Sequence, residues 1–486
     1  MGENMKIRII KFILFISLVV IFFVGYNKIF RIKLDEADSM KIFYEQKENT
    51  IDVLALGSSH VFGSINPAIL YRDYGIACYD LCGAGLPTKV SYYYLIEAIK
   101  TQTPKVIILG IEDTSLDGSN DIGTEYSYLW TGNMKWSLNK LNLVKDIAND
   151  NWIDVFLGYP VTHGRYDGDL AERDFLPYRG DIYHKYYKGN RVFWGVNEEA
   201  FNASDYPYTS EVGDFSGDTK QWIDGVLDIA NDISADVILY ASPALKDKSV
   251  QMSINAISEY AKARGVKFID LRKEQALINI DYENEMNDKE HVNYLGQEKT
   301  SQYIGKFLKE NFNLPDRRKD NNYVSWELCL EDYETAFNAR ILTLHTGNLE
   351  EYLKLLLNKD YTILVKFKGE NFDKKLLSER EGFAELGITL KQNCDNEMYL
   401  VCNGVPQDCD LGEYRELGNH SIIINEDNLQ YDLNIIGFPD NRITFIIFDN
   451  KQKSIVEYRY FFYDNISEEW ILEREDYGMQ AIWNKR

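Results

Sequence analysis

The chain has 486 residues, with 53 basic and 76 acidic side chains and a formal net charge of −23. This length predicts about two to four domains, and 45% hydrophobic with 27% charged residues excludes a wholly disordered chain. The acidic balance argues against nucleic acid as a partner, because phosphate binding requires clustered Lys and Arg. Aromatic side chains are abundant, with 34 Tyr, 24 Phe and 8 Trp.

An uncharged apolar run, Phe12–Tyr26, lies near the N-terminus. It is shorter than the roughly 20 residues that span a bilayer, but neighbouring apolar residues extend it if Arg8, Lys11 and Lys28 reach the interfaces. A cleaved signal peptide is the alternative, and no small-x-small cleavage site follows the run. We therefore expect residues 1–33 to form an uncleaved anchor. Basic residues flank it equally, so its short leading tail favours a cytoplasmic N-terminus with the rest of the chain outside.

Five short apolar runs follow, separated by helical patterns such as 90–101 and 253–264. The predicted strands are Ile51–Leu56, Ile76–Leu81, Lys105–Ile111, Asp236–Tyr240 and Val266–Leu271. Continuously apolar strands that alternate with helices indicate a parallel sheet covered on both faces, hence an α/β domain over 34–314. In such sheets ligands bind at the carboxyl ends of the strands.

Polar and glycine-containing segments stand at these strand ends. They are Gly57-Ser58-Ser59-His60, Cys82-Gly83-Ala84-Gly85, Gly110-Ile111-Glu112-Asp113 and, where a later helix opens, Asp288-Lys289-Glu290-His291. In the last segment the Asp288 carboxylate can accept from the imidazole Nδ1–H of His291, which leaves Nε2 to take a proton from Ser59. A capping serine and a capping aspartate beside a surface histidine are the alternative for each segment alone. Together the segments predict a catalytic triad.

Over about 51–312 these segments resemble the SGNH (GDSL-type) hydrolase family. The resemblance implies a flavodoxin-like three-layer α/β/α fold, Ser59 as nucleophile, and an oxyanion hole formed by the Ser59 and Gly85 N–H groups. The third segment departs from the family pattern, because Glu112 stands where that pattern has Asn. An ionised carboxylate only accepts hydrogen bonds, and loss of one oxyanion donor costs about 10²–10³ in rate. The oxyanion hole then rests on the two N–H groups, or Glu112 is protonated or turned away.

The anchor together with this domain resembles bacterial cell-surface acyl-transfer proteins, including the D-alanyl-transfer protein of teichoic acids and the O-acetylases of alginate-type polysaccharides. That resemblance implies a membrane-anchored, extracytoplasmic serine esterase or O-acyltransferase acting on O-acyl, in particular O-acetyl, groups of a surface glycan. It implies a membrane-bound O-acyltransferase as acyl donor, and no cofactor or metal. The alternative is a non-catalytic glycan-binding or scaffolding protein of envelope polysaccharide assembly, in which Glu112 marks lost activity.

The insertion 115–220 is rich in Trp and Tyr. A loop of this size at the carboxyl edge of a sheet is typical of a substrate site, and aromatic faces suit sugar rings. We expect substrate contacts from Glu112, Trp130, Tyr178, Arg179 and His184. The alternative is that these rings form a core of the insertion itself. A net charge of −23 favours a neutral sugar over a polyanion.

The polar segment 311–323 predicts a domain boundary, with a second α/β or α+β domain over 323–486. Its pattern DYTILVKFKGE…LG…MYLVCNG is weakly similar to the interleukin-like EMT-inducer (GG) domain, which implies carbohydrate binding. The expected elements are Leu349–Asn358, Tyr361–Phe367, Phe372–Leu386, Met398–Asn403 and a hairpin of Arg442–Phe448 with Ser454–Phe462. Cys394, Cys402 and Cys409 either form a disulfide or remain thiols.

Overall fold

The computed structural model describes residues 2–30, 35–158, 187–196, 201–344, 347–357, 360–376, 378–392, 394–409, 411–417, 420–432, 434–451 and 453–473. The chain divides into two compact units, Met1–Asp332 and Tyr333–Arg486. Each unit has its own apolar cores, so each is described by itself.

The first helix, α1 (Gly2–Phe30), carries the apolar run. Its segment Met5–Tyr26 has a mean hydropathy of 2.7, and none of it is buried. Among the described residues it is the one helix long and apolar enough to cross a membrane, a test that an N-terminal signal sequence also passes. The helix extends beyond the uncharged run because isoleucines flank that run on both sides.

The first unit is built on a five-stranded parallel sheet with strand order β2-β1-β3-β4-β5. The strands are β1 (Val53–Gly57), β2 (Cys78–Cys82), β3 (Val106–Gly110), β4 (Asp236–Ala241) and β5 (Lys267–Asp270). All five expected strands form within a few residues of their predicted bounds. The chain reverses direction across the sheet at β1 and β3, and the crevice at that point is where such folds bind ligands.

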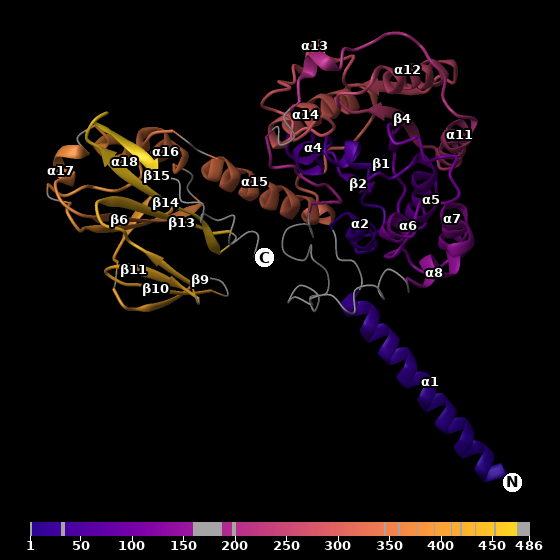
Figure 1. The fold of residues 1–486 in the computed structure, drawn as a ribbon, viewed down its shortest axis with the longest axis horizontal. Helices are drawn as coiled ribbons and strands as arrows, with labels where there is room; N and C mark the ends of the chain where they lie inside the picture. The colour runs from indigo at the N-terminus through magenta and orange to yellow at the C-terminus, as the bar shows by residue number, and fades with distance from the viewer. Residues whose placement is uncertain are drawn as a thin grey trace. The chain divides into compact units, whose positions relative to one another are not determined.

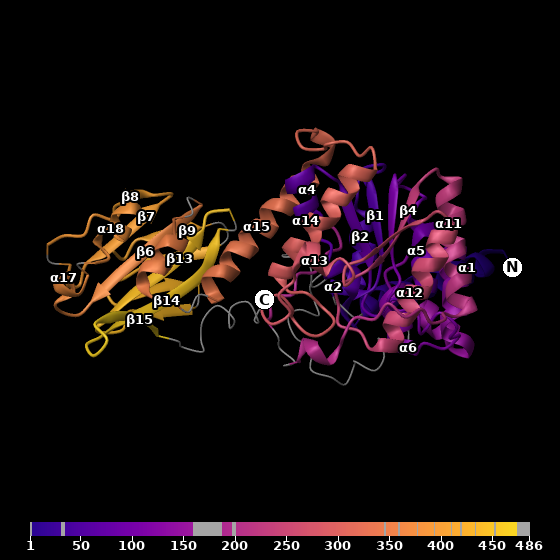
Figure 2. The same ribbon diagram turned by 90° about the horizontal axis from the view of Figure 1, so that it is seen from above.

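Helices cover both faces of this sheet (Figures 1 and 2). Side chains alternate along β1: Leu54 and Leu56 join one core, while Val53 and Ala55 join the other. The first core is covered by α5 (Thr88–Ala98), α7 (Leu138–Ala148), α11 (Gly217–Asp232) and α12 (Lys248–Ala263), and the second by α4 (Pro67–Tyr74) and α14 (Tyr294–Asn311). The predicted three-layer α/β/α architecture is therefore confirmed.

Shorter helices complete the first unit. They are α2 (Asp35–Tyr44), α3 (Ser59–Phe62), α6 (Thr124–Thr131), α8 (Trp152–Leu157), α13 (Gln275–Ile278) and the 3-10 turns η1 (Asn149–Asn151), η3 (Ala203–Asp205) and η4 (Asn321–Tyr323). Helix α7 lies in the insertion, and its Leu143, Val144 and Ile147 pack into the same core as the sheet. The described part of the insertion therefore enlarges the core of the domain.

The second unit contains a six-stranded sheet, β15-β14-β13-β6-β7-β8, and a four-stranded antiparallel sheet, β12-β11-β10-β9. Ile443, Phe445 and Ile447 of β13 pack against the helices, while Ile446 and Phe448 face the smaller sheet. The strands are β6 (Tyr361–Lys368), β7 (Met398–Cys402), β8 (Val405–Gln407), β9 (Tyr414–Leu417), β10 (His420–Ile424), β11 (Asn428–Tyr431), β12 (Asn434–Gly437), β13 (Arg442–Asp449), β14 (Ser454–Asp464) and β15 (Glu469–Glu473).

The expected helix Phe372–Leu386 is two helices, α17 (Phe372–Lys375) and α18 (Arg380–Glu385), and α16 is Leu349–Leu355. Helix α15 (Val324–Leu344) contains the division between the units. Its Trp326 is fully buried in the first unit, where the indole Nε1–H donates to the Cys78 carbonyl at 3.0 Å. No disulfide joins any of the six cysteines, all of which lie in the described part of the chain.

Candidate active site

A glycine at the end of β1 sets the position of the serine segment. Gly57 has φ +146, and a Cβ there would lie 2.6 Å from Val61 Cγ2 and 3.2 Å from Gly110 Cα. No side chain fits between these strand ends, so only glycine allows the chain to turn directly into α3. Ser58 caps that helix, with its Oγ accepting from the His60 N–H at 3.4 Å. Ser59 is the first helical residue, so its N–H has no intrahelical partner.

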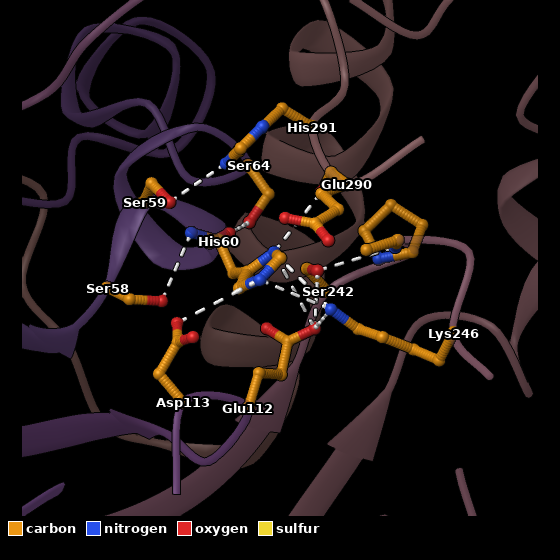
Figure 3. Close-up of polar contacts among 12 residues, drawn as sticks. Ser58, Ser59, His60, Ser64, Glu112, Asp113, Ser242, Lys246, Glu290 and His291 are labelled. Carbon is orange, nitrogen blue, oxygen red and sulfur yellow. Dashed lines mark hydrogen bonds and ion pairs between the residues drawn. The ribbon is translucent and has the colours of Figure 1, made fainter. Parts of the chain in front are cut away.

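Ser59, His291 and Asp288 form a hydrogen-bonded chain, and Figure 3 shows its Ser59–His291 contact. The Ser59 Oγ lies 2.8 Å from His291 Nε2, and His291 Nδ1 lies 2.9 Å from both Asp288 carboxylate oxygens. Because a carboxylate only accepts, Nδ1 carries the proton and Nε2 is left to accept from the serine hydroxyl. Burial alone would raise the pKa of Asp288, but its bonds to His291 hold that pKa well below its usual range.

The loop that carries this pair is held by the start of α14. The Asp288 Oδ1 accepts from the backbone N–H groups of Glu290 and His291 at 2.8 and 2.9 Å. Asn293 caps the helix, accepting from Leu295 N–H at 3.0 Å, and its Nδ2 donates to the Asn284 carbonyl at 2.8 Å. One buried side chain thus starts the helix and fixes the backbone around His291.

The glycine segment after β2 lies beside the serine strand. The Gly83 N–H donates to the Gly57 carbonyl at 3.2 Å, and Gly85 has the left-handed φ of +57. Within the described residues no hydrogen bond is made by the Gly85 N–H, so it remains available to a ligand. Trp130 is only 2% exposed, and its Nε1–H donates to the Ala84 carbonyl at 2.9 Å. Trp130 therefore holds this loop from within the core and does not present its ring to a substrate.

Glu112 is neither protonated nor directed at the serine. Its carboxylate is buried, with Oε1 accepting from Ser242 Oγ at 2.7 Å and from Lys246 Nζ at 3.1 Å. Burial alone would raise the pKa of Glu112, but the adjoining His60 imidazole and Lys246 ammonium, together with hydrogen bonds from Ser242, hold that pKa below its usual range. Of the alternatives that the sequence left open, the turned-away carboxylate is the one observed.

Two aromatic rings to which the sequence assigned no role pack against His291. His60 stacks on it with ring centroids 5.3 Å apart and an interplanar angle of 17°, and Phe193 lies at 4.7 Å. His60 is buried, with Nδ1 3.2 Å from the Glu290 carbonyl and Nε2 3.2 Å from Lys246 Nζ. The signal for His60 was its place directly after Ser59, whereas nothing local distinguishes Phe193.

A cavity of about 660 Å³ lies beside this site, between the segments that follow β3 and β4 and the loop before His291. Acidic side chains outnumber basic ones in its lining. The six carboxylates are Glu112, Asp113, Asp214, Asp218, Asp247 and Glu290, and the basic side chains are Lys246, Lys289 and His60. Serine and threonine hydroxyls and two rings, Tyr206 and Phe215, complete the walls. The lining is therefore acidic and rich in hydroxyl groups, with the aliphatic side chains of Leu245 and Val250 among them.

Three expected substrate contacts, Tyr178, Arg179 and His184, lie outside the described residues. The cavity rings Tyr206 and Phe215 come from the last part of the same insertion. In the described part of the chain no group of three or more His, Cys, Asp or Glu side chains has the arrangement of a metal site.

No protein-family profile matches the chain, and no curated protein does. A structure assigned as a lipolytic protein of the G-D-S-L family, from Desulfitobacterium hafniense DCB-2, is similar at 13% identity and a TM-score of 0.28, covering 54% of this chain and 100% of that one. A structure assigned as an acylhydrolase, from Bacteroides fragilis NCTC 9343, is similar at 11% identity and a TM-score of 0.28, covering 56% and 94%. What this chain does must therefore be inferred from the geometry of its own residues.

Proposed function

We propose that this protein is a membrane-anchored, extracytoplasmic serine esterase or O-acyltransferase that acts on O-acyl groups of a cell-surface polysaccharide. The observation that carries the proposal is the unbroken chain from Ser59 Oγ through His291 to Asp288, at 2.8 and 2.9 Å. A serine within hydrogen-bond reach of a base that is itself oriented by a carboxylate is the arrangement of an activated nucleophile.

The chemistry follows from the atoms in place. Ser59 Oγ attacks the acyl carbonyl while His291 Nε2 takes the hydroxyl proton, and the resulting imidazolium is stabilised by Asp288. The Ser59 and Gly85 N–H groups donate to the tetrahedral oxyanion. The C–O bond of the ester then breaks, His291 returns the proton to the departing alkoxide, and an acyl-Ser59 ester remains. Water or a sugar hydroxyl attacks that ester, which gives hydrolysis or transfer.

The walls of the neighbouring cavity support a glycan as the acceptor. Its carboxylates and hydroxyls accept hydrogen bonds from sugar hydroxyls, and Tyr206 and Phe215 offer ring faces. The excess of carboxylates disfavours a polyanionic chain. The apolar helix α1 supports membrane attachment, and a membrane-bound O-acyltransferase is the proposed acyl donor. For the second unit we propose carbohydrate binding, which would retain the enzyme on its polymer.

The test is covalent trapping of the nucleophile. The full chain in detergent micelles is treated with p-nitrophenyl acetate or a fluorophosphonate, and modified peptides are identified by mass spectrometry. We expect an adduct on Ser59 that disappears in Ser59→Ala and persists in the matched variant Ser58→Ala. Absence of an adduct from the native chain, or an equal adduct in Ser59→Ala, would favour the non-catalytic glycan-binding alternative. Release of acetate from acetylated polysaccharide, or its transfer, then identifies the acceptor.

A further inference from the structure

His60 lies between the general base and a buried ion pair (Figure 3). The His291 ring stacks on one side of His60, with the ring centroids 5.3 Å apart. On another side, Lys246 Nζ lies 3.2 Å from Nε2 and 3.5 Å from Nδ1 of His60. Lys246 is itself paired with Glu112 at 3.1 Å, and both side chains are buried. Three charged or titratable groups are therefore packed directly behind the catalytic histidine.

The hydrogen-bond partners of His60 determine its protonation state. The Glu290 carbonyl can only accept, so the Nδ1 that lies 3.2 Å from it carries the proton. The Lys246 ammonium can only donate, so the nearer Nε2 must be an acceptor. A proton on Nε2 would point that N–H at the Lys246 ammonium, which has no acceptor for it. These two contacts are those of the neutral Nδ1–H form, while the Glu112 and Asp113 carboxylates, 4.0 and 3.9 Å from the ring nitrogens, favour protonation.

We propose that Lys246 and His60 are positioning residues for the general base: Lys246 keeps His60 neutral, and neutral His60 holds the backbone and ring of His291 in place. During acylation His291 must become an imidazolium, and a charged ring stacked at 5.3 Å would oppose that change. The proposal rests on the proposed function, since it concerns the same reaction.

Glu112 provides the counterion that holds Lys246 beside His60. The Glu112 carboxylate, 3.1 Å from Lys246 Nζ, is the counterion of this buried ammonium. Ser242, which donates to the same Oε1 at 2.7 Å, fixes that carboxylate on the side of Lys246. The Glu that replaces the expected oxyanion Asn thus serves the general base and not the oxyanion.

The charged groups around His60 come from three elements. Glu112 at 4.0 Å and Asp113 at 3.9 Å follow β3, Lys246 follows β4, and Asp288 and His291 lie in the loop before α14. Phe193, with Arg191 over its ring at 5.3 Å, packs on the His291 side. Burial lowers the pKa of His60, Lys246 and His291 lower it further, and Glu112 and Asp113 oppose them. If the Lys246 charge is lost, the two carboxylates favour protonation of His60.

The experiment measures the rate at which a fluorophosphonate modifies Ser59 in the full chain, in detergent micelles, between pH 5 and 9. Only neutral His291 can accept the serine proton, so the rate of Ser59 modification falls on the acidic side of the pH profile. We call this fall the acidic limb of each variant. In Lys246→Met we expect that limb to move to lower pH by on the order of one unit, because charged His60 then lies against His291 and disfavours its protonation. Lys246→Arg retains a fixed cation, so its limb stays at the native position. Lys246→Met combined with His60→Gln has no titrating ring, so its limb returns to the His60→Gln position.

An unmoved limb in Lys246→Met, or a shift that persists in the double variant, overturns the proposal. A second measurement does not use the Lys246 variants: histidine-selective ¹⁵N NMR of the native chain, which has 6 His, with His60 assigned by His60→Gln. We expect His60 to keep the neutral Nδ1–H pattern from pH 5.5 to 8. Titration of His60 near the ordinary value of about 6.5 would overturn the proposal. A native chain that is never modified at Ser59 would contradict the proposed function and leave the NMR result standing.

Discussion

Each side chain of the proposed triad is held by a hydrogen bond to a neighbouring group in the first unit. Asp288 orients His291 through two 2.9 Å contacts, and His291 in turn meets the Ser59 hydroxyl at 2.8 Å. Asp288 itself is tied to the loop backbone at 2.8 and 2.9 Å, so its carboxylate cannot rotate away. The tautomer of the histidine is therefore set by bonds within four consecutive residues.

Replacing Asp288 by Asn tests this directly. The amide can donate to Nδ1, which favours the tautomer with the proton on Nε2, and that nitrogen can no longer accept from Ser59. We expect kcat/KM for p-nitrophenyl acetate to fall by about 10⁴ with little change in unfolding temperature. The control is Asn287→Ala, which removes a 2.9 Å bond to Asp288 Oδ2 but leaves the carboxylate. A loss below about tenfold in Asp288→Asn would remove the orienting role.

In the second unit, we expect the ionisation of one buried glutamate, Glu457, to make stability depend on pH. Glu457 on β14 is fully buried, and burial raises its pKa to about 7 from 4.5, against the lowering effects of Arg459 and the Tyr458 N–H. The folded state therefore binds the proton more tightly than the unfolded state, so the free energy of unfolding declines as the pH rises from 4.5 to about 7 and stays reduced above it.

Glu457→Gln should remove that decline. We expect the variant to gain up to about 3 kcal/mol over the native chain at pH 8, and little at pH 4.5. Urea unfolding of the second unit at both pH values measures the gain, with Glu469→Gln on β15, whose side chain is exposed, as the control. An equal gain at both pH values would contradict the role of Glu457 ionisation.

At the scale of secondary-structure elements, Asn293 at the start of α14 both caps that helix and binds the preceding loop. Asn293 accepts from Leu295 and Gly296 at the helix terminus and donates to the Asn284 carbonyl in the preceding loop. Capping alone contributes about 1 kcal/mol, whereas the bond to the loop also fixes the chain that carries His291. We therefore expect stability and Ser59 reactivity to be coupled at this residue.

Asn293→Ala separates the two effects when it is compared with another cap. Ser137 caps α7, accepting from the Lys140 N–H at 3.1 Å, on the insertion and away from the serine. Both Ala variants should lose about 1–2 kcal/mol of stability. Only Asn293→Ala should also reduce the rate of Ser59 modification, by about tenfold or more, because His291 loses its fixed position. Equal modification rates in the two variants would assign Asn293 a purely structural role.

At the scale of the whole molecule, α1 is the feature on which the proposed membrane attachment rests. Its segment Met5–Tyr26 is fully unburied, so its apolar surface is not covered by the protein itself. Burial of such a surface in hydrocarbon is strongly favourable, at roughly 25 cal/mol per Å². The proposed anchor would place this surface in a lipid bilayer.

We expect the full chain to remain with membranes after washing with alkaline carbonate, and a chain lacking residues 1–33 to be found in the aqueous fraction with Ser59 still reactive. Intact mass of the membrane-bound protein distinguishes an anchor from a cleaved signal. A mature chain that lacks the N-terminal segment would show that α1 is removed, and release of the full chain by carbonate would show that it does not span the bilayer.

The sequence by itself determined the α/β fold of the first unit and the residues to examine there. Apolar runs such as Val53–Gly57 are local signals, and parallel strands bring their carboxyl ends to one edge, so Ser59 and His291 were predicted to meet although they are far apart in the chain. The four-stranded sheet of the second unit was missed because its strands are short and carry few consecutive apolar residues.

Only the tertiary structure decided what the departure at Glu112 means. The residue is isolated in the sequence, and its partner Lys246 follows a different strand that becomes a neighbour only when β3 and β4 pair. The burial of Trp130 was equally beyond local pattern, because it depends on which loop packs over the ring. Strand periodicity is encoded locally, whereas charge pairing and burial depend on contacts between segments distant in sequence, and these decide how the site is tuned.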